Sequence, residues 1–183
     1  MSNLFQKLEI EAFRAGITPR TKESMEWFRR KATQLGRVGK SIMNDEAVKL
    51  QTSMKDPEGE MYMFFYDPKH KKTLPYYDKF PLIVMMGPAK GGFYGLNLHY
   101  LPPVLRAKVL DELLSEEDKK LALARLPKKY IGPMIKHYLS SNVKSRFALV
   151  EKPEWEIATF LPTAQFEKAR ASTVYAESRK MIR

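Results

Sequence analysis

The sequence predicts an α+β protein, and three features of the 183-residue chain lead to this prediction. Apolar residues recur at helical spacing over the first 58 positions, and helical spacing returns after position 101. Between these two parts, apolar and aromatic runs are bounded by Gly and Pro, which is typical of strands and turns. We therefore expect a helical N-terminal arm at residues 1–58 and an α+β core domain at residues 59–183. In this core domain, a small antiparallel sheet or SH3-like partial barrel at residues 59–101 precedes a helix-rich C-terminal half.

Two helices are predicted in the arm, with a third, shorter one after them. The segment LFQKLEIEAFRAG carries apolar residues at helical spacing from Leu4, and Gly16 marks its end. Thr18 and Pro19 suit the N-cap and the first position of a second helix that ends at Gly36. SIMNDEAVKLQTSM favours the third helix. Because neither of the first two has a broad apolar stripe, the arm is equally consistent with packing against a partner and with a self-contained bundle.

Three strands are predicted in the core domain. MYMFFY is apolar at every position, as in a strand buried on both faces, and Gly59 and Asp67-Pro68 bound it. PLIVMM is the second strand, with Pro81 only at its start. Gly87-Pro88 and Gly91-Gly92 then indicate a turn. The third strand, FYGLNLHYL, alternates, so that one face carries Tyr94, Leu96, Leu98 and Tyr100 and the other carries Gly95, Asn97 and His99.

The C-terminal half is predicted to be mostly helical. PVLRAKVLDELL has leucines on one side and Arg106 and Lys108 on the other, and SEED at Ser115 indicates the start of another helix that ends before Pro127. RFALVEKPEWEIATFL favours a pair of strands that returns to the sheet. The tail from Thr163 onward is basic and helix-prone.

Composition narrows the classes of function. Lys and Arg outnumber Asp and Glu by 32 to 21, which gives a net charge of +11 and favours nucleic acid or acidic protein surfaces as partners. The chain has no cysteine, which excludes disulfides, thiolate metal sites and a cysteine nucleophile. No apolar run approaches the roughly 18 residues of a membrane span. We therefore expect a protein without a membrane span, made in the cytoplasm.

No motif in the sequence indicates catalysis. The three histidines do not fall in metal-ligand spacing, so His70 is interpreted as a loop residue, His99 as a hydrogen-bonded residue of a strand's polar face, and His137 as a helix-surface residue. Asp67 and Asp78 are interpreted as turn caps rather than as an acid/base pair. We therefore predict no catalytic, cofactor or metal site, and a protein that is not an enzyme.

One constellation suits partner binding. Cationic and aromatic side chains alternate after the first strand, and we predict a contact loop made of Lys69, His70, Lys71, Lys72, Tyr76, Tyr77 and Lys79. Cations can neutralise phosphates while tyrosine rings stack on bases, but the same side chains also suit a protein interface. On residue type alone, the protein interface is favoured over nucleic acid.

Two blocks, MYMFFYDPKHKKTLPYYDKFPLIVMM and GGFYGLNLHYLPPVLRAKVLDEL, resemble a family of small proteins encoded by contractile-tailed bacteriophages of the T-even-like group. The later VKSRF and WEIATFLPTAQFEKA resemble the closing segment of that family. This resemblance implies a virion protein whose partners are other phage structural proteins in a multi-subunit assembly. The expected function is structural, in the tail, baseplate or neck. The alternative is a DNA-binding protein of the phage head or of packaged DNA ends.

A second alternative belongs to another class. GEMYMFFYDP followed by FPLIVMM is weakly similar to the first strands of the SH3-like barrel of MazF-type endoribonucleases, which implies an RNA-binding module or nuclease. In that pattern an arginine precedes the proline, whereas this chain has Lys79-Phe80-Pro81. The similarity therefore concerns the barrel shape more than RNA cleavage.

Overall fold

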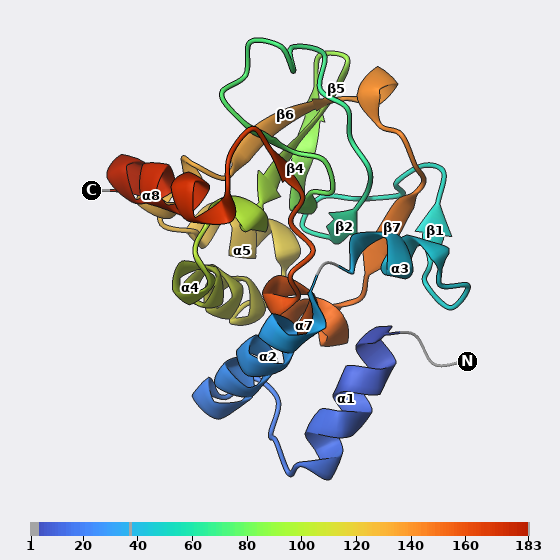
Figure 1. Cartoon of the computed structure of the whole chain (residues 1–183), viewed down its shortest axis with the longest axis vertical. Helices are drawn as coiled ribbons and strands as arrows, with labels where there is room; N and C mark the ends of the chain where they lie inside the picture. The colour runs from blue at the N-terminus through green and yellow to red at the C-terminus, as the bar shows by residue number, and fades with distance from the viewer. Residues whose placement is uncertain (1–3, 37, 183) are drawn as a thin grey trace.

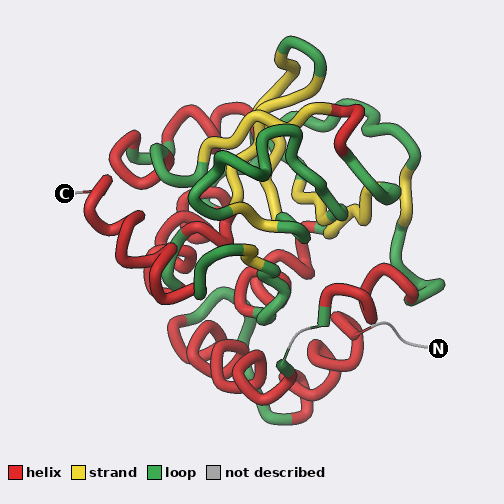
Figure 2. The backbone as a smooth tube through the Cα atoms, turned by 45° about the horizontal axis from the view of Figure 1, so that its top comes forward, coloured by secondary structure: helices red, strands yellow, loops and turns green. Residues whose placement is uncertain are grey.

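The chain has the α+β architecture that the sequence predicts, and the computed structural model describes residues 4–36 and 38–182. Residues 1–3 of the predicted arm and Arg183 of the predicted tail lie outside the described residues. The helices are α1 (Leu4–Arg14), α2 (Lys22–Leu35), α3 (Gly39–Asn44), α4 (Pro103–Leu114), α5 (Lys119–Arg125), α6 (Lys128–Ile131), α7 (Trp155–Phe160) and α8 (Ala171–Ile182). Strands occupy the upper part of the molecule, and α1, α2, α4 and α7 lie below them (Figures 1 and 2). No helix within the described ranges is long and apolar enough to cross a membrane.

The central sheet is antiparallel and open. Its strand order is β1-β7-β2-β4-β5-β6, so that β1 and β6 are its two edges in the described part of the chain. The strands are β1 (Leu50–Gln51), β2 (Met61–Met63), β4 (Leu82–Ala89), β5 (Gly92–Asn97), β6 (Ile135–Leu139) and β7 (Phe147–Val150). The predicted small sheet is therefore present, but it extends beyond residues 59–101, because β1, β6 and β7 come from outside that range. A separate two-stranded sheet pairs β3 (Tyr77–Asp78) with β8 (Phe166–Glu167).

Both faces of the central sheet are buried, as the continuous apolar runs predict. Alternate residues of β2, β4 and β7 enter two different clusters, because successive side chains of a strand point to opposite faces. One face packs on the helices and contributes Met61, Met63, Leu82, Val84, Ala148 and Val150 to the main core. The other face joins an aromatic cluster through Tyr62, Phe64, Tyr66, Ile83, Met85, Phe93, Tyr138 and Phe147. Most of the aromatics before the cationic loop are thus core residues.

The hairpin and the third strand differ in detail from the prediction. Gly87 and Pro88 lie within β4 at a register shift, and the turn is Lys90-Gly91 alone, since Ala89 pairs with Gly92. Gly91 has φ +75°, which a two-residue hairpin turn favours. The strand β5 ends at Asn97, whose side chain accepts a hydrogen bond from the backbone N–H of His99 at 2.9 Å. This bond begins a 3-10 helix, so residues 98–100 do not continue the predicted alternation.

The starts of two helices also differ from the prediction. The second helix begins at Lys22 with Thr21 as its N-cap, because Thr21 and Ser24 form a reciprocal capping box, and Thr18 lies outside it. The helix after α4 begins at Lys119, capped by Asp118 rather than by Ser115. The third predicted helix ends at Asn44, and part of the remainder forms β1.

Two elements are of a different type from the one predicted. The second half of RFALVEKPEWEIATFL is helix α7 rather than a strand, because Glu151 and Glu154 form a capping box around Pro153 and start a helical turn. His137 lies on strand β6 and not on a helix, since residues 135–139 pair with β5 throughout. The expected return of this region to the sheet is confirmed for β7.

The N-terminal helices pack against the rest of the chain. Phe5, Leu8 and Phe28 belong to the same core cluster as the helix-facing side of the sheet. Glu156 of α7 accepts hydrogen bonds from the hydroxyl of Ser24 and, at 3.2 Å, from the backbone N–H of Arg20. The described residues of the arm therefore share a core with residues 59–182, while the domain boundary at residue 58 stays a prediction.

Arg106 is buried, although the helical pattern predicts it on the polar side of α4. Its guanidinium donates to the carbonyls of Leu101 at 2.7 Å, Thr159 at 3.2 Å and His99 at 3.2 Å, and to the Tyr175 hydroxyl at 2.7 Å. Carbonyls from two chain segments and a hydroxyl from α8 meet there, and a five-donor guanidinium satisfies them together. This cation is thus structural.

Asp78 is the centre of a second buried polar group. Its carboxylate accepts hydrogen bonds from the backbone N–H groups of Phe80 and Gln165 and from the Asn97 amide, each at 3.1 Å, and from His99 Nδ1 at 2.6 Å. Burial opposes its charge, but the His99 ring and these hydrogen bonds outweigh that effect and lower the pKa of Asp78. Burial lowers the pKa of His99, whose Nε2 lies 2.8 Å from the Thr163 hydroxyl. An ionised Asp78 thus holds β3, β5 and the segment before β8 together.

We expect Asp78→Ala to lower the free energy of unfolding by roughly 3 to 5 kcal/mol, because four buried donors lose their acceptor. Urea unfolding followed by circular dichroism measures this change. The matched control is Asp67→Ala, since Asp67 forms an exposed ion pair with Lys71 at 2.9 Å and such pairs contribute about 0 to 1 kcal/mol. Equal effects of the two substitutions would contradict a structural role for the Asp78 network.

Candidate functional site

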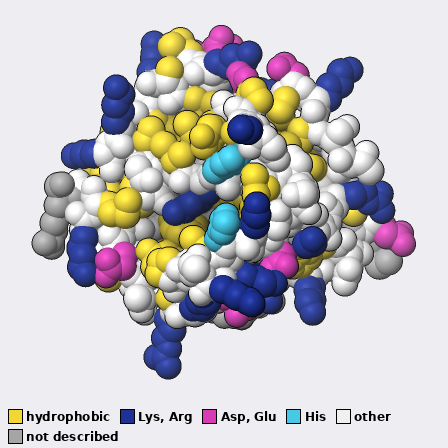
Figure 3. Space-filling view, turned by 90° about the horizontal axis from the view of Figure 1, so that it is seen from above, with side chains coloured by type: hydrophobic (Ala, Val, Ile, Leu, Met, Phe, Trp, Pro, Cys, Tyr) yellow, Lys and Arg dark blue, Asp and Glu magenta, His cyan; other side chains and the backbone are white. Residues whose placement is uncertain are grey.

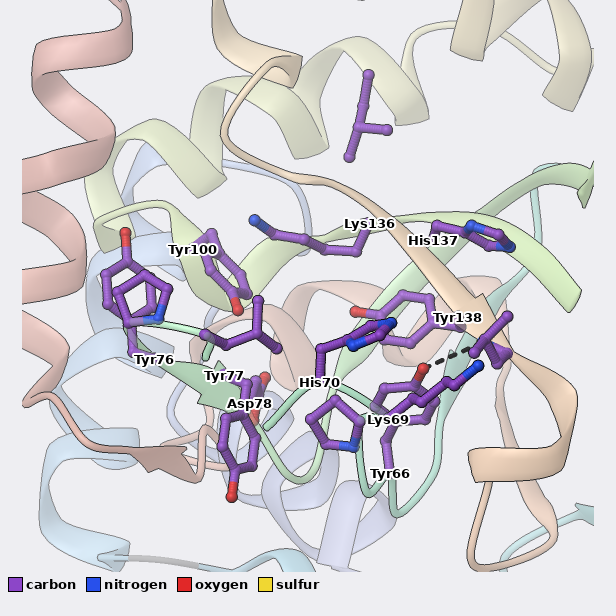
Figure 4. A pocket seen from close by; sticks show the side chains of 15 residues that line it. Tyr66, Lys69, His70, Tyr76, Tyr77, Asp78, Tyr100, Lys136, His137 and Tyr138 are labelled. Atoms are coloured by element: carbon purple, nitrogen blue, oxygen red, sulfur yellow. Dashed lines mark hydrogen bonds between the residues drawn. The ribbon is translucent and has the colours of Figure 1, made fainter. Parts of the chain in front are cut away.

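A pocket of about 680 Å³ lies between the 66–78 segment and edge strand β6. Five tyrosines contribute to its walls, together with basic, histidine and apolar side chains (Figure 4). Its lining residues are Tyr66, Pro68, Lys69, His70, Leu74, Pro75, Tyr76, Tyr77, Asp78, Tyr100, Ile135, Lys136, His137, Tyr138 and Leu139. Figure 3 looks down on the molecule and shows histidine, hydrophobic and cationic side chains together at the centre of this face, with further Lys and Arg side chains around its rim. The pocket thus combines cations with exposed aromatic surface.

The aromatic walls are held in place from behind. The Tyr138 hydroxyl accepts a hydrogen bond from Asn97, and Asn97 in turn donates to Asp78, each at 3.1 Å. The Tyr66 hydroxyl accepts from the backbone N–H of Leu139 at 3.0 Å, which ties the end of β2 to β6. The ring centroids of Tyr66 and Tyr138 lie 4.9 Å apart. These contacts join the tyrosine rings to the buried Asp78 network, so the folded core fixes the position of this wall of the pocket.

Tyr76 and Tyr100 form a second wall. Their ring centroids are 6.0 Å apart with planes inclined by 38°, and Tyr100 also packs edge-on against Phe166 at 5.3 Å. Burial raises the pKa of both phenols, so each keeps its proton at neutral pH. Protonated phenol rings offer hydrogen-bond donors and uncharged faces, and neither repels an anion.

Lys136 is the unusual cation of the pocket. Its Nζ lies 3.8 Å from the centroid of the Tyr100 ring, and among the described residues it has no carboxylate partner within ion-pair distance. Burial lowers the pKa of Lys136 to about 8. The ammonium is therefore still mostly charged at neutral pH, but it is partly dehydrated and lies against the face of a tyrosine. Such a group favours an anion.

The predicted contact loop is divided by the structure. Lys69, His70, Tyr76 and Tyr77 line the pocket, whereas Lys71, Lys72 and Lys79 do not. Lys71 pairs with Asp67 at 2.9 Å and Lys79 with Glu167 at 3.2 Å, so acidic neighbours offset part of their charge. The backbone carbonyl of Lys72 accepts a hydrogen bond from Lys168 at 3.0 Å. The loop's role in binding stays a prediction, but only these four of its residues lie at the pocket.

Eleven of the fifteen lining residues lie outside the predicted site, and among them are Tyr100, Lys136, His137 and Tyr138. These four come from segments far from the loop in sequence, and the pairing of β6 with β5 places them opposite it. The alternation of apolar and polar residues in IKHYL was a usable strand signal. Nothing in the sequence, however, indicates which long-range pairing this short strand makes.

The group of Asp78, His99 and Thr163 is not accessible to a substrate. Asp78, His99 and Thr163 follow the order of an acid, a base and a hydroxyl, but both His99 and Thr163 are 0% exposed, so no substrate reaches the hydroxyl. His70 is exposed on its loop as predicted, and no hydrogen bond joins its ring to either aspartate in the described residues. Within the same residues, no group of three His, Asp or Glu side chains could hold a metal ion.

Comparison with known proteins gives one match. The family described as phage T4 terminal DNA protecting protein matches residues 5–181 of the chain. No curated protein and no solved structure matches it significantly. The matched range includes every residue that lines the pocket.

We expect Lys136→Met to stabilise the protein at pH 7, because the substitution removes a dehydrated charge and keeps the apolar stem. A pKa lowered from 10.5 to about 8 corresponds to an upper bound near 3 kcal/mol, and the partial exposure of this lysine reduces the gain to roughly 1 to 2 kcal/mol. Between pH 8 and 10.5 the unfolded state binds more protons at Lys136 than the folded state. The stability of the wild type should therefore rise relative to the variant as the pH rises.

Thermal unfolding of both proteins from pH 7 to 9.5 measures this difference. The control is Lys72→Met, an exposed lysine outside the pocket, which should change stability by less than about 0.5 kcal/mol at every pH. A loss of stability in Lys136→Met would show that the ammonium has a stabilising partner in the folded protein.

Proposed function

The chain belongs to the family of phage T4 terminal DNA protecting proteins, and on this premise we propose that it binds the ends of phage DNA and shields them. The family match over residues 5–181 is the observation that carries the proposal. Membership agrees with the resemblance to proteins of T-even-like phages. It favours the DNA-binding alternative over the structural role in a tail, baseplate or neck, since the family description names DNA and no tail component.

The charge of the molecule supports a polyanionic partner. A net charge of +11 raises the local concentration of DNA and speeds its encounter with the protein at low salt. Lys69 and Lys136 stand at the pocket among tyrosine rings, which is the combination that single-stranded nucleic acids need, because cations meet phosphates and aromatic faces stack on bases. We infer that this face, rather than the helical end of the molecule, contacts the DNA.

The proposed action is binding without turnover. Protection of a DNA end requires only that the protein occupies the terminus longer than a nuclease needs to begin digestion. The buried Asp78 and His99 pair has a structural use. The proposed location is the virion, at the head, with other phage structural proteins as further partners.

We expect the purified protein to bind a linear duplex more tightly than a covalently closed circle of the same sequence, and to slow digestion of the linear form by an added exonuclease. Electrophoretic mobility shift and a digestion time course measure these two effects. Affinity should fall steeply as salt rises from 50 to 200 mM, because bound cations displace counterions from the phosphates. Equal affinity for circle and linear duplex, with no protection, would overturn the proposal.

Lys69→Glu should weaken end binding several-fold, because it reverses a charge at the pocket. The matched control is Lys22→Glu at the start of α2, which makes the same change of charge at the opposite end of the molecule (Figure 1). If both variants lose the same affinity, binding depends on net charge and not on this face.

A further inference from the structure

We propose that the pocket between the 66–78 segment and β6 receives the terminal nucleotide of a DNA strand, with Lys136 binding its terminal phosphate monoester. This inference rests on the proposed function and assigns it a site and a ligand chemistry. Three features carry it: a half-buried cation with no carboxylate partner among the described residues, aromatic walls of suitable size, and a pocket too small for an internal stretch of duplex.

The cation is the first feature. Surface lysines such as Lys71, Lys79 and Lys180 each have a carboxylate nearby, whereas the half-buried Lys136 packs on the Tyr100 ring and has no carboxylate partner within the described ranges. Holding an ammonium away from water without a counterion is costly, and a bound anion would supply that counterion. Figure 4 shows the Lys136 side chain crossing the pocket toward Tyr100 and Tyr76, with His70 on the facing loop.

The walls indicate a nucleotide rather than free phosphate. A volume of about 680 Å³ exceeds what a phosphate ion fills and lies within the roughly 300 to 1,000 Å³ of pockets that bind small organic ligands. Tyr76 and Tyr100 form one wall, and Tyr77 also lines the pocket, so a base that enters beside the phosphate meets ring faces. Leu74 and Ile135 add apolar contact. Stacking of this kind tolerates any base, which suits a terminus of arbitrary sequence.

The size of the pocket indicates an end. A nucleotide inside a duplex is held by a paired base and by a diester on each side, and it cannot enter a one-nucleotide pocket without local melting. A terminal nucleotide has only one such neighbour. Its monoester also carries about −1.5 to −2 charge, against −1 for a diester, so a single dehydrated cation binds it more strongly. The negative charge of Asp78 at the pocket floor is offset by its four donors.

Protonation of Lys136 sets the pH range in which the proposed site works. Other titratable groups line the pocket with it. The loop contributes Lys69 and His70, β3 and the residue before it contribute Tyr76, Tyr77 and Asp78, the 3-10 helix contributes Tyr100, and β6 contributes His137 and Tyr138. With its pKa lowered to about 8, Lys136 loses its charge above that pH. The preference for a phosphorylated end should therefore decline from pH 7 to pH 9.

The first test uses three short duplexes of one sequence that carry a 5′-phosphate, a 3′-phosphate or only hydroxyl ends, with binding followed by fluorescence anisotropy. We expect one of the phosphorylated duplexes to bind about tenfold more tightly than the hydroxyl duplex, and the comparison identifies which terminus is recognised. Lys136→Met should bind all three alike at the hydroxyl affinity. The control Lys72→Met should keep the preference, because Lys72 does not line the pocket.

The second test needs no variant. Deoxyadenosine 5′-monophosphate and deoxyadenosine are titrated into the wild-type protein, and the NMR signals of the Lys136 side chain and the pocket tyrosines are followed. The monophosphate should shift them at lower concentration than the nucleoside. The 3′-monophosphate serves as the third arm.

The outcomes separate the two proposals. If the wild type prefers linear DNA over a circle but binds phosphorylated and hydroxyl ends alike, the pocket inference is overturned and end binding stands. If it does not prefer linear DNA at all, the proposed function fails. A phosphate preference that survives in a folded Lys136→Met protein would place the phosphate elsewhere and overturn the pocket inference. Binding of a phage protein, rather than of nucleotides, to the pocket would also overturn it.

Discussion

The carboxylate of Asp78 is the hydrogen-bond acceptor that joins the chain segments around the candidate pocket. Four donors from the chain converge on it, and they come from the segment between β3 and β4, from the end of β5, from the 3-10 helix and from the segment before β8. Through Asn97 the same group fixes the Tyr138 hydroxyl, and its neighbours in sequence are Tyr76 and Tyr77. The two-stranded β3 and β8 sheet is too short to be stable alone, so this buried charge, more than strand pairing, positions the tyrosines against β6.

Lys136 differs from the two fully buried ions in its surroundings. Arg106 and Asp78 are buried with their hydrogen bonds satisfied, whereas Lys136 is half-buried against an aromatic face. In a protein shaped for stability alone, an apolar residue would serve better at this position. Proteins accept such local losses where a ligand completes the site, and the stable network around Asp78 provides the rigidity that lets them. The contrast between the fully buried, hydrogen-bonded Arg106 and Asp78 and the half-buried Lys136 thus separates structural ions from the candidate site.

Much of the fold followed from local rules, and much of the site did not. Continuous apolar runs such as MYMFFY and PLIVMM correctly indicated strands buried on both faces, and Gly91 correctly indicated the hairpin. Starts of helices were misplaced because several Ser, Thr and Asp residues compete as caps, and only packing selects among them. The buried Arg106 contradicts a pattern rule because its partners are carbonyls from distant segments. Four of the seven residues of the predicted contact loop line the pocket. The opposite wall of the pocket could not be predicted, because it depends on the pairing of β6 with β5, which no local signal encodes.

The distribution of cations also separates attraction from recognition. Lysines of the contact loop such as Lys71 and Lys79 lie at the surface beside acids, so under the proposed function their contribution is to the long-range field that attracts any DNA. Contacts of that kind do not distinguish an end from the middle of a duplex, because every phosphodiester looks alike to them. A protein that must distinguish an end needs a feature that only an end can satisfy. A small aromatic pocket with one dehydrated cation has that property, since an internal nucleotide can neither enter it nor offer the doubly ionised phosphate that the cation favours.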